Sequence, residues 1–164
     1  MRPVSAHTTI DAPREVVFER LLDLSLRPSF TDHFLDELRL QRIEPYGVGA
    51  SARFRIGDSG PWLDTSIAEI EPPYRIRELG HGGRENRIPT FTVWELVAAG
   101  GSGCEVTVTF WTEPSYFVDR IREPWPVRSL RRSWKRALRR LAETVETGQA
   151  PVPVEVGGGP RIPY

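Results

Sequence analysis

The chain has 164 residues with 22 basic and 22 acidic side chains, which is the length of one ordinary domain with no net charge at neutral pH. Hydrophobic residues make up 39% of the chain, which excludes disorder throughout, and the balanced charge excludes a global attraction to nucleic acid. The single Cys104 cannot form a disulfide within the chain, and no apolar run resembles a signal peptide or a membrane span. We therefore expect a cytoplasmic protein without integral membrane association.

The first part of the chain predicts one strand followed by two short helices. Residues 4–10 put their apolar side chains on one face, at the two-residue spacing of a strand. Asp11 and Pro13 are typical of a helix start, and apolar side chains at helical spacing follow from residue 16 to residue 24. A second short helix is predicted between Pro28 and Glu37.

Six further strands are predicted in the middle of the chain, where the apolar period shortens to two residues. Short spacers rich in glycine and proline separate them, which favours consecutive antiparallel hairpins. Apolar and polar side chains alternate, as Ala52, Phe54 and Ile56 do with their neighbours, so one face of the sheet is apolar and the other polar. The predicted strands are residues 38–44, 51–56, 62–70, 74–79, 88–97 and 104–113.

A long amphipathic helix is predicted over residues 124–147. At about 100° per residue its apolar side chains fall within one arc, while arginines and one lysine occupy the opposite side. Gly148 is typical of a C-terminal stop. We therefore divide the chain into a domain of residues 1–148 and a Pro/Gly-rich extended tail of residues 149–164.

The order of these elements predicts an α+β fold, in which the last helix covers the apolar face of a curved seven-stranded antiparallel sheet. Large side chains such as Phe54 and Trp134 are expected to hold the helix off the sheet and to leave an internal space, which is the usual kind of ligand site. The predicted wall of this cavity comprises Phe54, Ile56, Trp94, Phe110, Trp134, Leu138 and Leu141.

The segment IDAPREVVFERLLD, residues 10–23, resembles the opening signature of the SRPBCC superfamily, which includes START, pollen-allergen and polyketide cyclase/dehydrase types. The resemblance extends through Val48-Gly49, residues 67–76, the hairpin of residues 94–106 and the closing helix, and covers roughly residues 3–148. It implies a helix-grip fold around a cavity. Members bind lipids, sterols, polyketides or other apolar molecules, and some are cyclases, dehydratases or co-chaperones, so the fold alone does not decide the chemistry.

The leading interpretation is that the cavity binds a small or medium hydrophobic ligand, either a lipid, a polyketide or an aromatic molecule. An alternative is a polyketide cyclase/dehydratase-type enzyme in the same cavity, and a further alternative is an interaction module similar to a chaperone activator. An enzyme needs an acid or base beside the cavity. The catalytic candidates, for each of which a solvated loop or strand edge is the favoured interpretation, are Asp64, Glu113, His33 and His81.

No cofactor and no metal are predicted, because His7, His33 and His81 lack the close spacing of metal ligands. The basic side of the last helix is first interpreted as pairing with acidic residues of the same chain or of a second copy. Weak contact with anionic lipid is the alternative, and monomer and homodimer both stay open. We call this side the Arg face and represent it by Arg128, Arg132, Arg136 and Arg139.

Overall fold

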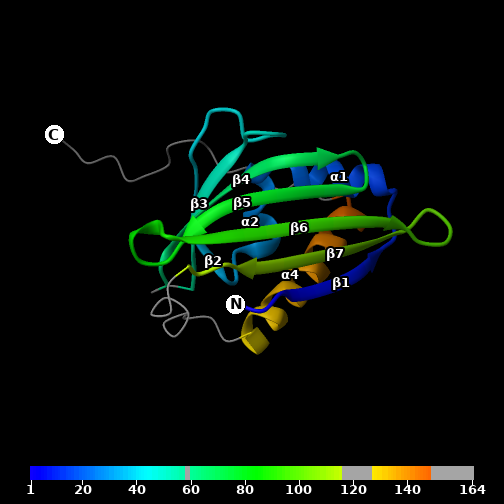
Figure 1. Ribbon diagram of the computed structural model, residues 1–164. Helices are drawn as coiled ribbons and strands as arrows, with labels where there is room; N and C mark the ends of the chain where they lie inside the picture. The colour runs from blue at the N-terminus through cyan, green and yellow to red at the C-terminus, as the bar shows by residue number, and fades with distance from the viewer. Residues whose placement is uncertain (58–59, 116–126, 149–164) are drawn as a thin grey trace.

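Seven antiparallel strands form one curved sheet whose inner face wraps around the helix α4 (Val127–Glu146), as Figure 1 shows. This computed structural model describes residues 1–57, 60–115 and 127–148. The strands are β1 (Val4–Ile10), β2 (Leu35–Leu40), β3 (Ser51–Ile56), β4 (Trp62–Glu71), β5 (Arg75–Gly82), β6 (Ile88–Ala98) and β7 (Cys104–Thr112). The predicted α+β helix-grip fold is confirmed.

The spatial order of the strands is β1-β7-β6-β5-β4-β3-β2, so each strand from β2 to β7 pairs with its neighbours in sequence. The first strand closes the sheet at the far edge, where Val4 lies opposite Phe110 and Ile10 opposite Cys104. Short hairpins explain the meander, because antiparallel partners need only a few residues between them.

Between β1 and β2 the chain forms the helix α1 (Arg14–Leu22), the 3₁₀ turn η1 (Leu24–Leu26) and the one-turn helix α2 (Pro28–Thr31). Pro13 precedes α1 and Pro28 is the first residue of α2, positions where a missing backbone N–H costs no hydrogen bond. The Asp23 carboxylate accepts hydrogen bonds from the Ser25 N–H and hydroxyl, at 2.9 and 2.6 Å, and so caps η1. A second 3₁₀ turn, η2 (Arg84–Asn86), lies between β5 and β6.

The core lies between the inner face of the sheet and the apolar side of α4. Alternate residues of each strand point inward, as Cys104 and Val106 do in β7, while Glu105 between them is exposed. On α4 the side chains that pack inward are Leu130, Trp134, Ala137, Leu138, Leu141, Ala142 and Val145. The predicted apolar arc of this helix is therefore the buried one over the described residues.

The stretch between α2 and β3 differs from the sequence prediction. The second short helix lies within the predicted interval and ends at Thr31. Strand β2 begins at Leu35, so the predicted strand of residues 38–44 begins and ends too late. Leu35 pairs with Ile56, and a register shift follows between Asp36 and Arg39. This bulge breaks the two-residue alternation, so the sequence pattern does not reveal the start of the strand.

The described part of α4 ends at Glu146, and Gly148 follows with a φ of +63°, in agreement with the predicted glycine stop. The predicted start of this helix at residues 124–126 and the predicted tail of residues 149–164 lie outside the described residues. Among the described residues, none of the helices combines the length and the apolarity needed to span a bilayer.

Candidate functional site

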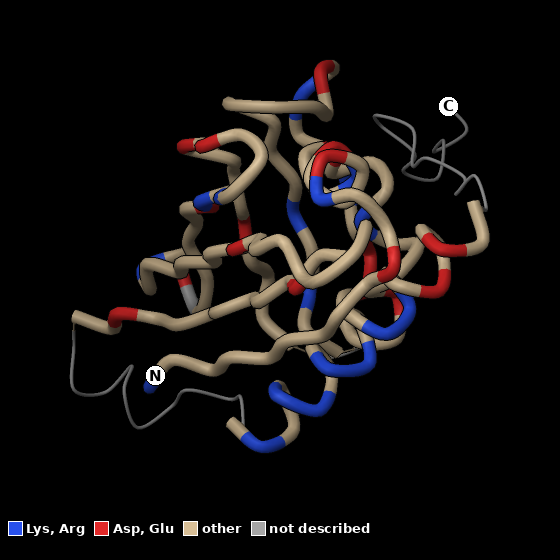
Figure 2. The backbone as a smooth tube through the Cα atoms, turned by 90° about the vertical axis from the view of Figure 1, so that its right-hand side faces the viewer, with Lys and Arg blue, Asp and Glu red and all other residues tan. Residues whose placement is uncertain are grey.

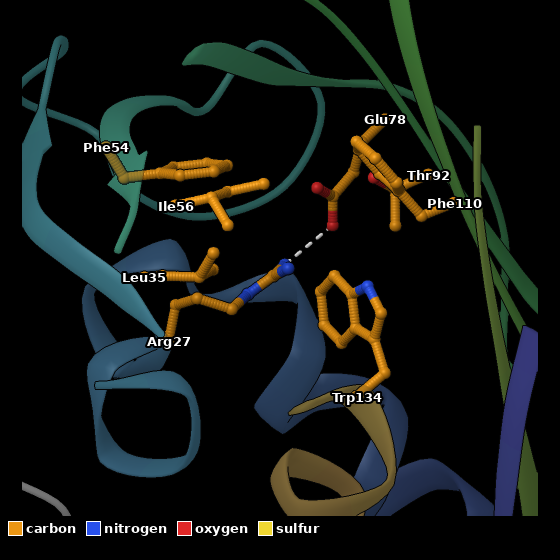
Figure 3. A pocket seen from close by; sticks show the side chains of 8 residues that line it. All are labelled: Arg27, Leu35, Phe54, Ile56, Glu78, Thr92, Phe110 and Trp134. Atoms are coloured by element: carbon orange, nitrogen blue, oxygen red, sulfur yellow. Dashed lines mark hydrogen bonds and ion pairs between the residues drawn. The ribbon is translucent and has the colours of Figure 1, made fainter. Parts of the chain in front are cut away.

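A small cavity lies between α4, η1 and the inner face of the sheet (Figure 3). Its volume is about 10 Å³, which is room for about one water molecule. Half-buried β3 side chains form one side, and buried groups of β5, β6 and α4 form the other. The lining residues are Arg27, Leu35, Phe54, Ile56, Glu78, Thr92, Phe110 and Trp134.

Apolar side chains form most of the cavity wall, but the wall also contains an ion pair. The Arg27 guanidinium donates through Nη2 to Glu78 Oε1 at 2.6 Å (Figure 3). Arg27 is only 4% exposed and Glu78 only 3%. A buried charge without a partner is very unfavourable. Arg27 and Glu78 can therefore be buried only as a pair.

The Glu78 carboxylate also holds two further donors. Trp94 Nε1 donates to Oε1 at 2.7 Å, and the Thr65 hydroxyl donates to Oε2 at 3.1 Å. The Arg27 guanidinium lies over the Trp94 ring, 4.9 Å from its centroid, and 5.9 Å from that of Phe30. The charged pair is therefore fixed by strands β4, β5 and β6 from one side and by two aromatic rings.

Local structure places Arg27 at this point. It follows η1 directly, and its backbone N–H bonds to the Leu24 carbonyl, while its own carbonyl accepts from the Thr31 hydroxyl at 2.8 Å. Glu78 is at an inward-facing position of β5, two residues after the fully buried Ile76. The inward register of the strand therefore forces this carboxylate into the core.

Sequence reasoning did not identify Arg27 or Glu78 as site residues. For Glu78 a signal existed, because an acidic residue at the inward position of an otherwise apolar alternation is unusual. For Arg27 there was none, since a short segment between two helical turns has no useful period. Only the fold brings these residues, 51 positions apart, together.

The structure distributes the predicted cavity residues over two environments. Phe54, Ile56, Phe110 and Trp134 line the cavity. Trp94 is fully buried beside it, with its ring edge-to-face against Trp134 at 5.6 Å between centroids. Leu138 and Leu141 are fully buried in the core, on the same side of α4 as Trp134 but outside the lining.

The four acid or base candidates are not brought together at the cavity. Asp64 and His81 are opposite each other on β4 and β5, at outward-facing positions. The Asp64 carboxylate accepts from Gln41 Nε2 at 3.0 Å and from Asn86 Nδ2 at 2.6 Å. Glu113 follows β7 and accepts from the Trp111 indole at 2.9 Å.

His33 lies in the contact between α2 and α4. Its Nε2 is 3.1 Å from the Ser133 carbonyl, and its Nδ1 is 3.3 Å from Arg140 Nη1. Burial, together with the nearby Arg136 and Arg140, lowers the pKa of His33 from its ordinary value of 6.5, despite its hydrogen bond to Ser133. Hydrogen bonds from Arg140 lower the pKa of the neighbouring Asp32.

The Arg face lies on the side of α4 that is turned away from the sheet, where basic positions follow one another along the helix (Figure 2). Arg128, Arg132, Arg136 and Arg139 are exposed. Arg140, at the edge of this face, pairs with Asp32. For the remaining basic residues of the face, no ion pair with an acidic side chain occurs within the described ranges 1–57, 60–115 and 127–148.

In the part of the chain that the structure describes, no three His, Cys, Asp or Glu side chains gather in a group that could hold a metal ion. The polar groups at the cavity are instead one paired carboxylate, one guanidinium, hydroxyls and indole N–H groups. Such groups can make hydrogen bonds and apolar contacts.

Comparison with known proteins identifies the family. Residues 1–146 match the family model described as polyketide cyclase/dehydrase and lipid transport. No curated protein matches the chain.

Several solved structures share the fold. Protein CV1439 from Chromobacterium violaceum is 19% identical with a TM-score of 0.65, over 88% of this chain and 96% of its own. Norcoclaurine synthase from Thalictrum flavum, solved with dopamine and hydroxybenzaldehyde, is 11% identical with a TM-score of 0.67, over 91% and 88%. DynU16, described as a putative protein in the dynemicin biosynthetic locus, is 22% identical with a TM-score of 0.61, over 90% and 48%.

The buried ion pair generates the first prediction. Replacing Glu78→Gln or Arg27→Met leaves the other residue charged and buried without its partner, so each change is expected to lower the free energy of unfolding by about 3–5 kcal/mol. The double variant is expected to lose less than the sum of the two single losses. Urea unfolding of the four proteins measures both effects.

The matched control is Glu69→Gln. Glu69 pairs with Arg77 at 2.7 Å, but both side chains are exposed on the outer face, so a loss of only about 0–1 kcal/mol is expected. A loss at Glu78 no larger than this control would contradict the assignment of a buried charge pair.

The pKa of His33 generates the second prediction. Because the unfolded chain takes up a proton near the ordinary pKa of 6.5 and the folded chain only at lower pH, the contribution of His33 to stability is complete above about pH 6.5 and is lost as the pH falls below it. The melting temperature is expected to fall between about pH 7 and pH 5, and His33→Gln is expected to flatten this slope.

Asp32 affects stability in a separate pH range. Because the pKa of its carboxyl is lowered in the folded chain, its contribution to stability is complete above the ordinary value of 3.8 and is lost in stronger acid. The control is His81→Gln, which should keep the wild-type slope since that residue is exposed on β5. An unchanged slope in His33→Gln would show that another group causes the pH dependence.

Proposed function

Since the chain belongs to the polyketide cyclase/dehydrase and lipid-transport family, we propose that it binds a small hydrophobic ligand in the cavity between α4 and the sheet. The observation that carries this proposal is the composition of the wall, where Phe54, Ile56 and Phe110 surround a single, internally neutralised ion pair. An apolar wall with few fixed polar groups is the usual composition of a site for an apolar molecule.

The size of the cavity adds a condition to this proposal. At about 10 Å³ it does not hold an aromatic ring, so the ligand must displace part of the wall. Phe54 and Ile56 on β3 are half-buried, whereas Arg27 and Glu78 are buried and held by several contacts. We therefore propose that the side chains of β3 move when a ligand enters. Burying about 200 Å² of apolar ligand surface contributes about 5 kcal/mol toward this opening.

A second candidate is a cyclase- or dehydratase-type enzyme that uses the same cavity. The observation that favours it is the Glu78 carboxylate beside Arg27, a base and a hydrogen-bond donor on one wall. The family description and the dynemicin biosynthetic locus of DynU16 are consistent with such chemistry. Binding is preferred, because the Glu78 carboxylate already accepts hydrogen bonds from Arg27, Thr65 and Trp94, which hold it in place.

The Arg face supports a proposal about where the ligand is taken up. Exposed arginines along one side of α4 can contact the phosphates of an anionic lipid surface, since guanidinium groups bind phosphate through two N–H groups. We propose weak, reversible contact of this kind.

The location we propose is the cytoplasm. Cys104 is buried, burial raises the pKa of its thiol, and in the cytoplasm it remains a free thiol.

Ligand binding is tested with a panel of anthraquinone, oleic acid and cholesterol. At about 100 times its dissociation constant, a bound member is expected to raise the melting temperature by about 5–10 °C. Thr92→Leu fills the cavity and is expected to abolish this shift. Thr107→Leu, at an outward-facing position of β7, is the matched control and should retain it.

No shift with any of the three compounds, or equal shifts in both variants, would contradict binding at this cavity.

A measurement of substrate turnover distinguishes an enzyme from a protein that only binds its ligand. Conversion of a linear poly-β-ketone that is lost in Glu78→Gln, with binding retained, would favour the enzyme.

Contact with lipid is tested by sedimentation with vesicles of phosphatidylcholine alone or with about 30% phosphatidylserine. Binding is expected only to the anionic vesicles and is expected to weaken with salt. Each of Arg128→Gln and Arg132→Gln should weaken it about 3–5-fold, on the basis of about 1 kcal/mol for each basic residue at the surface. Arg77→Gln, on the outer sheet face, is the control, and an equal effect there would contradict a role for the Arg face.

A further inference from the structure

Two donors at the wall of the cavity have no hydrogen-bond acceptor among the described residues, and they are Trp134 Nε1 and the Nε of Arg27. Both residues are only 4% exposed, and both line the cavity. Figure 3 shows the indole nitrogen of Trp134 on the side of the ring that is turned toward Thr92 and Phe110. Buried donors are nearly always paired, so an unpaired indole N–H at a cavity indicates an acceptor supplied from outside the chain.

The neighbouring Trp94 shows what a purely structural tryptophan does in this core. Its N–H donates to Glu78 at 2.7 Å, and its ring packs edge-to-face against Trp134. Phe34 contacts the Trp134 ring from another direction, at 5.0 Å between centroids. These contacts are between ring surfaces and do not involve the indole N–H, so they do not account for the nitrogen.

The charges at the cavity indicate an uncharged acceptor. The Arg27 guanidinium and the Glu78 carboxylate neutralise each other at 2.6 Å, and the other six lining residues carry no charge. An anionic or cationic ligand would therefore bring a charge without a counter-ion into a buried site, which is strongly unfavourable.

The supply of donors at the site favours a carbonyl oxygen over a hydroxyl. A hydroxyl also brings a proton that needs an acceptor, and the Glu78 carboxylate already accepts from Arg27, Trp94 and Thr65. A carbonyl brings two lone pairs and no proton.

We infer that the ligand is an uncharged apolar molecule whose carbonyl oxygen accepts a hydrogen bond from Trp134 Nε1. This inference rests on the proposed ligand-binding function and names the chemical class of the ligand. Arg27 also lines the cavity, and its Nε is a second donor without an acceptor among the described residues. The role of Trp134 is thus to orient the ligand, while the apolar wall supplies most of the affinity.

The experiment compares three molecules of nearly equal size, which are 1-tetralone with a carbonyl, tetralin without one, and 1-naphthoate with a negative charge. Calorimetry measures their affinities for the wild type, for Trp134→Phe and for the control Trp111→Phe. Trp111 lies on the outer face, where its N–H donates to Glu113. The ratio of tetralone to tetralin affinity is expected to fall about 3–10-fold in Trp134→Phe and to stay constant in Trp111→Phe.

A second measurement on the wild type does not depend on the stability of the variant. In the ¹H,¹⁵N NMR spectrum, the indole proton signal that is missing from Trp134→Phe is expected to move downfield on addition of tetralone, as a new hydrogen bond requires, and not to move downfield with tetralin. Unchanged affinity ratios, or 1-naphthoate binding more tightly than tetralone, would overturn this inference and leave ligand binding intact. If none of the three binds the wild type, the proposed function fails as well.

Discussion

The ion pair between Arg27 and Glu78 is the constraint on which the rest of the site depends. It places two charges in a core that otherwise consists of aromatic and aliphatic side chains, and this is tolerated only because each charge is paired and hydrogen-bonded. The pair links the turn after η1 to the middle of the sheet, at residues that are 51 positions apart. It therefore fixes one wall of the cavity, while the β3 side is made of half-buried side chains.

In the proposed ligand site, this arrangement separates two tasks, affinity and orientation. The apolar side chains around the cavity provide affinity without direction, since burial of apolar surface is not directional. The polar groups provide direction, and the pairing of Arg27 with Glu78 removes net charge from the site. The group that is then available to recognise a ligand is a neutral hydrogen-bond donor, the indole N–H of Trp134, in a place where water has little access.

Most of the fold could be predicted from the sequence, because alternation within the strands and the amphipathic period of residues 127–146 are strong local signals. The start of β2 could not, because the bulge between Asp36 and Arg39 interrupts the alternation. At the site, four aromatic or aliphatic wall residues were predictable from their inward orientation, namely Phe54, Ile56, Phe110 and Trp134. Arg27 and Glu78 were not, since their pairing is a property of the tertiary structure.

The place of β1 in the sheet has a consequence for the order in which the protein is assembled. Strand β1 pairs with β7, and the amino group of Met1 donates to the Thr112 carbonyl at 2.9 Å, so β1 has no partner strand until β7 has been synthesised. Pairing closes a loop of roughly a hundred residues, and contacts of such long range slow folding. Trp134, which completes the cavity, is made later still, so during synthesis the cavity is among the last parts of the fold to form.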